Sequence, residues 1–173
     1  MKKKQYIKFM ILIFTLLILI GAIGYFRIID KSLIRSMLKE YKQELCTVNI
    51  SDDKSFSNLN EEGQIEFTAY LESFKKYFTE EGFKGFFGDR RGSVYRDYVE
   101  ANPDVSLKFK GIKYDKFEYD SENNRYIVNY KLQIQASDDQ IYTETIQSVI
   151  IKENGQWKID HEKIYNYGSM FNN

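Results

Sequence analysis

Residues 149–165 hold the only tryptophan and the only histidine of the chain, Trp157 and His161, with Asp160 beside the histidine. Aspartate and histidine form a common acid–base pair in enzymes, because the imidazole carries a proton and the carboxylate orients the ring. On a β-strand, however, neighbouring side chains point to opposite faces. We therefore expect Trp157 and Ile159 to fill the core, His161 to lie on the same face nearer the strand's end, and Asp160 to point away from it unless a bulge intervenes.

The other candidates for chemistry are tyrosines. Together with His161, they would line a pocket if the domain enclosed a small apolar ligand or, as a weaker alternative, a substrate; they are Tyr114, Tyr126 and Tyr130. Tyrosines in such strands more often pack in the core or at its edge than act in catalysis. The residues give no convergent catalytic set, and we predict a protein that is not an enzyme.

The sequence predicts neither a metal site nor a cofactor. The single cysteine, Cys46, cannot form an internal disulfide and has no Cys/His cluster around it. The loop 120–124, DSENN, offers oxygen ligands at alternate positions. Arg125, however, stands where an EF-hand loop needs glycine, and Lys131 stands where it needs the closing glutamate.

Residues 82–93, GFKGFFGDRRGS, combine glycines with aromatic and basic side chains. The glycine spacing fits neither a dinucleotide-binding loop nor a P-loop. One interpretation is a helix–turn–helix whose phenylalanines cap the core. The other is a partner-binding surface, because aromatic and arginine side chains are enriched at interface hot spots; its members would be Phe83, Phe86, Phe87, Arg90 and Arg91.

The stretch 9–26 contains no charged residue. As a helix it would be about 27 Å long, close to the hydrocarbon thickness of a bilayer. We expect a single-pass membrane anchor with a cytoplasmic basic tail at 1–8, because long domains are translocated largely regardless of the flanking charges. The alternative is a signal peptide cleaved near Ala22 and Gly24, where small residues have suitable spacing. Both interpretations place the rest of the chain outside the cytoplasm.

Charge is distributed unevenly along the chain. The 25 basic and 25 acidic residues balance. Four of the lysines, however, precede the first acidic residue, Asp30, so the remainder carries an excess of acid. Such a balance does not predict nucleic-acid binding, which needs a clustered basic face. The expected partners are the membrane and other envelope proteins or a second copy of the chain.

Helical periodicity predicts three helices beyond the anchor. Residues 31–46 carry apolar side chains at helical spacing, so 27–46 forms either a stalk or the first helix of the domain. A polar loop at 47–60 follows. Asn60 is a plausible N-cap for a second helix ending near Thr79, and a third helix starts near Ser93 and ends before Pro103.

Alternating periodicity predicts four strands within the domain at 47–173. The first begins near Val105 and is bent at Gly111; the others cover 126–135, 141–151 and 156–165. Asn154 and Gly155 are a strong signal for a tight hairpin. Short connections require antiparallel pairing. We therefore predict an α+β fold in which about three helices cover one face of a curved four-stranded antiparallel sheet.

Helices followed by a bent meander that closes on GQWKID, residues 155–160, resemble the nuclear transport factor 2-like fold. The stretch VYRDYVEANPDV, residues 94–105, is similar to the last helix and first strand of bitopic assembly proteins of type IV secretion and conjugation systems. That family carries an Asn-Pro-x-Gly motif near its carboxyl end. The tail here has Asn166 and Gly168 but lacks the proline, and the spacing is one residue shorter. The resemblance implies a membrane-anchored scaffold of a secretion or conjugation complex; the alternative is a cone-type domain that binds a small apolar ligand.

Overall fold

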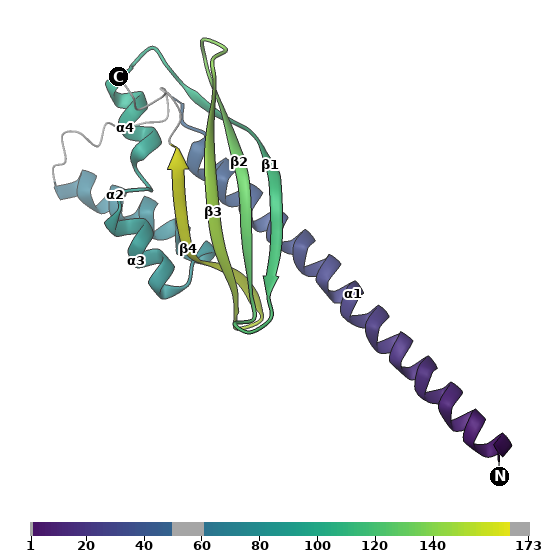
Figure 1. The fold of residues 1–173 in the computed structure, drawn as a ribbon. Helices are drawn as coiled ribbons and strands as arrows, with labels where there is room; N and C mark the ends of the chain where they lie inside the picture. Colours follow the sequence, from purple (N-terminus) through teal and green to yellow (C-terminus); the bar gives the residue numbers. More distant parts are fainter. Residues whose placement is uncertain (1, 50–60, 167–173) are drawn as a thin grey trace. The chain divides into compact units, whose positions relative to one another are not determined.

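A computed structural model describes residues 2–49 and 61–166, apart from some side chains near the amino end and Glu62 (Figure 1). The chain divides into two compact units, Met1–Arg35 and Ser36–Asn173. Asn60 and Gly168, which carried sequence predictions, lie outside the described residues.

The amino-terminal unit consists of part of α1, a single helix that runs from Lys2 to Cys46. The expected membrane segment 9–26 lies within α1, but several of its side chains are outside the described ones. Among the residues that are described, no helix is long and apolar enough to cross a membrane. The membrane anchor therefore stays a prediction.

The second unit contains the sheet. Its strands are β1 (Leu107–Asp120), β2 (Arg125–Ala136), β3 (Ile141–Glu153) and β4 (Gln156–Asn166). They lie in the order β1-β2-β3-β4, each antiparallel to the next (Figure 1). Asn154 and Gly155, between β3 and β4, have φ angles of 50° and 81°, as a primed hairpin turn requires. The predicted α+β class with a four-stranded antiparallel sheet is confirmed.

The helices of this unit are more numerous than predicted. Besides the end of α1, the described residues form α2 (Glu61–Ser73), the 3-10 helix η2 (Phe74–Tyr77), α3 (Glu80–Gly88) and α4 (Val94–Ala101). The predicted second helix is thus split into α2 and η2. The helix α3 was not predicted, because glycine disfavours helix interiors.

Thr79 starts α3. Its hydroxyl oxygen accepts a hydrogen bond from the backbone N–H of Gly82 at 3.0 Å, and Glu80 and Glu81 occupy the first turn, where the helix dipole favours negative charge. The side chains of Phe83 and Phe86 are buried on the inner side of the helix. Capping and burial together outweigh the low helix propensity of the glycines.

Bulges in the two edge strands change which of their side chains point to the inner face of the sheet. On β1 the register shifts between Phe109 and Gly111, close to the predicted bend. On β4 it shifts between Ile159 and His161, which leaves Asp160 as the extra residue. Trp157 and Ile159 are buried, as expected, but the prediction that His161 shares their face is wrong. Beyond the bulge His161 is exposed, and the next residue points inward.

The amino end of α3 packs directly on this bulge. The backbone N–H of Thr79 donates to the Ile159 carbonyl at 3.0 Å, and its hydroxyl donates to Asp160 Oδ1 at 3.0 Å. A Cβ atom added at Gly82 would lie 2.3 Å from the Ile159 carbonyl oxygen, which is backbone and cannot rotate away. Only glycine permits this contact between α3 and β4.

We therefore expect Gly82→Ala to lower the free energy of unfolding by about 1–3 kcal/mol, the range for overpacking a well-filled site. Gly85→Ala is the matched control in the same helix, because nothing lies within 4 Å of its added Cβ. It should be neutral or stabilising by up to about 1 kcal/mol, since alanine favours helix. Urea unfolding of the full chain in mild detergent measures both; equal effects would mean that the α3–β4 contact is looser than described.

Candidate functional site

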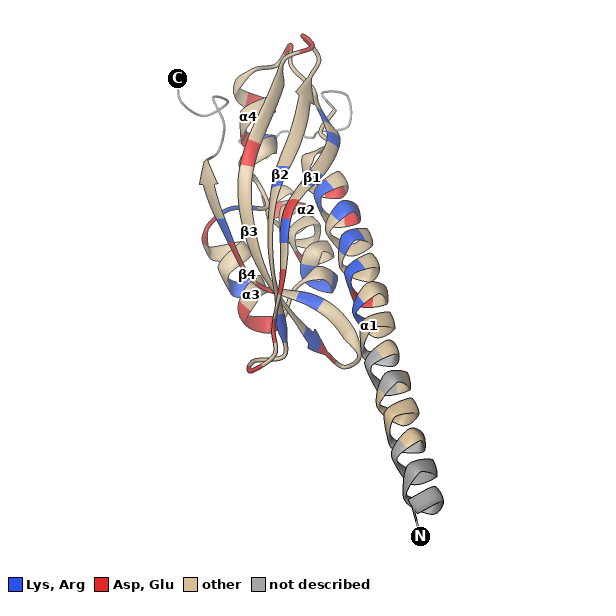
Figure 2. Ribbon diagram, turned by 45° about the vertical axis from the view of Figure 1, so that its right-hand side comes forward, with Lys and Arg blue, Asp and Glu red and all other residues tan. Residues whose placement is uncertain are grey.

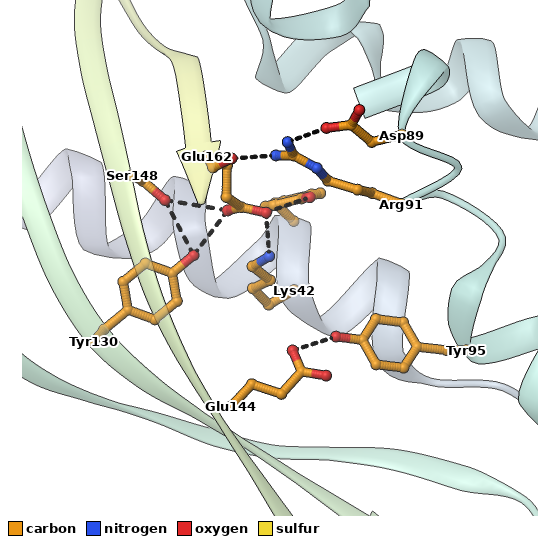
Figure 3. Close-up of polar contacts among 9 residues, drawn as sticks. Lys42, Asp89, Arg91, Tyr95, Tyr130, Glu144, Ser148 and Glu162 are labelled. Carbon is orange, nitrogen blue, oxygen red and sulfur yellow. Dashed lines mark hydrogen bonds and ion pairs between the residues drawn. The ribbon is translucent and has the colours of Figure 1, made fainter. Parts of the chain in front are cut away.

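The most unusual feature of the second unit is a charged pair inside its core. Glu162 on β4 is 2% exposed and Lys42 on α1 is 0% exposed. The Lys42 Nζ lies 2.8 Å from Glu162 Oε1, and the Tyr41 hydroxyl donates to the same oxygen at 3.3 Å (Figure 3). A charge in this setting is tolerated only with an opposite charge and hydrogen bonds around it.

The other oxygens of Glu162 are also hydrogen-bonded. The hydroxyls of Tyr130 on β2 and Ser148 on β3 donate to Oε2 at 3.0 Å and 3.1 Å. Arg91 donates to its backbone carbonyl and also pairs with Asp89 (Figure 3). Burial alone would raise the pKa of Glu162, but the Lys42 ammonium and the hydrogen bonds outweigh it and hold that pKa below its ordinary value. Glu162 is therefore ionised at neutral pH.

A second carboxyl group lies in the same interior. Glu144 on β3 is fully buried, and its Oε2 accepts from the Tyr95 hydroxyl of α4 at 2.7 Å (Figure 3). Its Oε1 is buried without a hydrogen-bond partner among the described residues. Burial raises the pKa of Glu144 to about 6, although Tyr95 and Lys42 oppose the shift. The two carboxyl groups thus have pKa values pushed in opposite directions.

Two carboxyl groups with separated pKa values are an arrangement that acid–base enzymes use. A catalytic group must also reach its substrate. The network side chains, however, are at most 2% exposed; they are Tyr41, Lys42, Tyr95, Tyr130, Glu144, Ser148 and Glu162. In this conformation the network joins α1 and α4 to the inner face of the sheet, and apart from Glu144 Oε1 the polar atoms described above are hydrogen-bonded within it.

The predicted partner-binding residues are divided between core and surface. Phe83 and Phe86 are 8% and 0% exposed, and Arg91 points toward β4, with 13% of its side chain exposed. Phe87 is 46% exposed and Arg90 is also exposed. Of these five residues only Phe87 and Arg90 are therefore exposed, and their role in binding stays a prediction.

The predicted pocket residues do not form one group. Tyr126 and Tyr130 are fully buried, Tyr114 is half-buried and His161 is exposed on the opposite side of the sheet. The Tyr126 ring packs edge-on against Trp157 with centroids 5.2 Å apart. Tyr130 joins the Glu162 network. The structure thus brings Tyr130 to the polar core and separates His161 from it.

Sequence reasoning missed the charged members of this core. Two of them carried a readable signal: Lys42 lies four residues after Leu38 and so falls on the apolar face of its helix, and Glu144 alternates in phase with buried residues of β3. A charged residue in an apolar phase indicates a buried, paired group. Glu162 carried no such signal, because the Asp160 bulge alone turns it inward.

No family model matches this sequence, and no curated protein matches it. Among solved structures, the chain is similar to the intermembrane space region of the chloroplast protein ARC6, with 10% sequence identity and a TM-score of 0.31. That match covers 62% of this chain and 97% of the other. A similarity this low carries no argument about fold or function.

Glu144 makes stability depend on pH. Its pKa rises from an ordinary value of 4.5 to about 6 on folding, so the native state holds the proton more tightly than the unfolded chain. Its stabilising effect is present below pH 4.5 and is lost as the pH rises through about 6. At pH 8 the buried charge then costs about 2 kcal/mol, by the conversion of about 1.4 kcal/mol per pKa unit.

We expect Glu144→Gln to raise the free energy of unfolding by up to about 2 kcal/mol at pH 8 and to have little effect at pH 4. The glutamine oxygen can still accept from Tyr95. Glu122 is exposed, so Glu122→Gln is the control and should leave the free energy of unfolding unchanged at both pH 8 and pH 4. Urea unfolding across this pH range measures the difference; a variant that is less stable than the native chain at pH 8 would contradict the assignment.

Proposed function

We propose that this protein is a membrane-anchored, extracytoplasmic scaffold domain that binds other envelope proteins and has no enzymatic activity. One observation carries the proposal: the uncharged segment 9–26 and the core residues Leu38, Tyr41 and Lys42 belong to the same helix, α1. The apolar helix thus continues into the structural core of the domain that it would anchor.

The apolar character of α1 supports the anchor. Large side chains at several positions around the helix are exposed, from 36% at Ile29 to 69% at Ile28; they include Met10, Ile13, Phe14, Leu16, Ile18, Tyr25 and Phe26. A helix that is apolar all round needs an apolar environment, and a bilayer supplies one. Lysines at 2, 3, 4 and 8 precede the segment. We place the amino terminus in the cytoplasm and the domain outside.

The burial of the network side chains, among the described residues, supports a scaffold rather than a ligand-binding or catalytic cone. Two of the tyrosines expected to line a pocket are already engaged, Tyr126 with Trp157 and Tyr130 with Ser148 and Glu162. Glu162 is paired with Lys42, and Glu144 Oε2 accepts from Tyr95, within the buried core. Recognition then falls to the surface of the domain.

The nuclear transport factor 2-like fold, and the resemblance to assembly proteins of type IV secretion and conjugation systems, are part of this proposal. The stretch 94–105, which carries the resemblance, forms α4 and the approach to β1. In such a complex, Phe87 and Arg90 at the end of α3 would contact a partner.

A topology experiment tests the anchor and the orientation. Cys46 is buried, so a cysteine introduced in the exposed β2–β3 turn by Asp138→Cys provides the accessible thiol. We expect a membrane-impermeant maleimide to label Asp138→Cys in intact cells, with the chain at full mass and retained in membranes after alkaline extraction. Labelling only after lysis would contradict the orientation. A chain shortened near Gly24 and released from the membrane would establish a cleaved signal peptide.

A crosslinking experiment tests the partner surface. Phe87→Ala and Arg90→Ala should each reduce the yield of copurifying proteins, or of crosslinked dimer, several-fold without changing the melting temperature, because exposed interface residues contribute little to folding. Tyr165→Ala is the matched control, since Tyr165 is 54% exposed and aromatic but lies on β4. If Phe87→Ala and Tyr165→Ala gave the same crosslinked products as the native chain, the α3 end would not be a partner surface.

A further inference from the structure

The outer face of the sheet, on the side away from the helices, is rich in lysine. Side chains that alternate with the buried ones point to this face. Its basic residues recur along the strands, β1 and β2 above all (Figure 2), and five exposed lysines define what we call the outer lysine face: Lys108, Lys113, Lys116, Lys131 and Lys163. Although acidic residues outnumber basic ones in the domain, charge on this face is mostly positive.

Several acidic groups of this face are already paired. The distance from Lys116 Nζ to Glu118 Oε2 is 2.7 Å, and that from Arg125 Nε to Asp120 Oδ2 is 2.9 Å. The distance from Lys158 Nζ to Glu153 Oε2 is 3.2 Å. By contrast, no carboxylate among the described residues forms an ion pair with Lys113 or Lys131.

Lys113 and Lys131 are moreover directly opposite each other in the β1–β2 register. Two like charges at directly opposed positions destabilise a sheet. An anion placed over the two ammonium groups would remove this repulsion. The pair is therefore mildly unfavourable in the isolated domain, and a negatively charged partner would relieve that repulsion.

The rest of the face indicates the shape of that partner. Between the lysines lie neutral polar side chains: Asn129, Gln133, Thr143, Thr145 and Gln147. The aromatic residues of β1, β2 and β3 all lie on the inner face. On β4 the exposed Tyr165 ring lies beside Lys163 and its hydroxyl donates to Gln147, so the face offers one ring at its edge rather than a row of rings on which successive nucleobases could stack. Ile127, Val149 and Ile151 also lie on this face and are half-buried. Spaced lysines among neutral polar side chains match an extended array of phosphate groups.

We propose that the outer lysine face binds the phosphate headgroups of anionic phospholipids and so holds the domain against the bilayer. This inference rests on the proposed membrane anchor, which would keep the domain at high local concentration next to lipid. Each lysine near an anionic surface strengthens binding about fivefold, and the effect falls off within a Debye length. Such contacts are weak singly, but they suffice for a tethered domain.

The test uses the full chain reconstituted into vesicles of phosphatidylcholine alone or mixed with phosphatidylglycerol. A membrane-impermeant acylating reagent modifies outward-facing lysines, and mass spectrometry gives the rate at each one. We expect Lys113 and Lys131 to react several-fold more slowly in the phosphatidylglycerol vesicles at low salt, and at equal rates at high salt. Lys84 on α3 is the internal reference and should react equally in both.

Variants that remove lysine charges test whether protection depends on the outer lysine face or only on the total charge of the domain. Lys113→Gln combined with Lys131→Gln should reduce the protection of Lys116 and Lys163 by phosphatidylglycerol. The matched pair Lys75→Gln with Lys76→Gln, which removes the same charge from η2, should leave that protection unchanged. All four lysines are exposed, so we expect both pairs of substitutions to preserve folding.

The outcomes distinguish this inference from the anchor. Failure of the chain to float with phosphatidylcholine vesicles overturns the anchor alone, because protection by added phosphatidylglycerol vesicles still reports on the face. Equal lysine reactivity in both vesicle types overturns the lipid-binding face, whatever the flotation shows. Protection by duplex DNA without protection by phosphatidylglycerol also overturns it, in favour of nucleic-acid binding.

Discussion

The carboxylate of Glu162 is the constraint around which the domain is organised. A buried negative charge is tolerated only if donors from the rest of the fold converge on it. Here the donors come from α1 through Tyr41 and Lys42, from β2 through Tyr130 and from β3 through Ser148. Removing any one element would leave buried charge or hydroxyl groups unsatisfied. The network thus fixes how the end of α1 docks on the sheet, even though a buried ion pair adds little net stability over apolar packing.

That carboxylate points inward only because β4 contains a bulge. With regular alternation after Ile159, His161 would point inward and Glu162 would face solvent. Thr79 and Gly82 at the start of α3 hold the bulged backbone through hydrogen bonds and close contact. The helix α3 therefore positions a charge that it does not itself touch. The bulge at Asp160 thus determines which charged side chain enters the core.

The sequence predicted the features that depend on neighbouring residues and missed those that depend on distant ones. Four strands, their antiparallel order and the Asn154–Gly155 turn follow from alternation and turn chemistry. The helix α3 did not, because glycines at 82, 85 and 88 argue locally against a helix and the compensating contacts come from β4. His161 points outward and Glu162 inward, the reverse of what regular alternation predicts, because contacts with the distant helix α3 hold the bulge at Asp160. Of the buried polar site, only Tyr130 was singled out. Lys42 and Glu144 stand in apolar phases of their elements, but the partner of Lys42, Glu162, lies 120 residues away and turns inward only through the bulge, so the pairing itself leaves no local pattern.

The charged groups inside the domain and those on its surface have different surroundings. Inside, the Lys42 and Glu162 charges are paired, and Glu144 is buried with a raised pKa. These groups hold helices to the sheet, and their side chains are buried. Outside, Phe87 and Arg90 lie on the helix side, whereas Lys113 and Lys131 lie on the opposite side of the sheet. Because the two surfaces do not overlap, a domain of this size could lie against a lipid surface through one and hold a protein partner through the other. Contact of the proposed lipid-binding face with a membrane would then leave the proposed partner surface, Phe87 and Arg90, open.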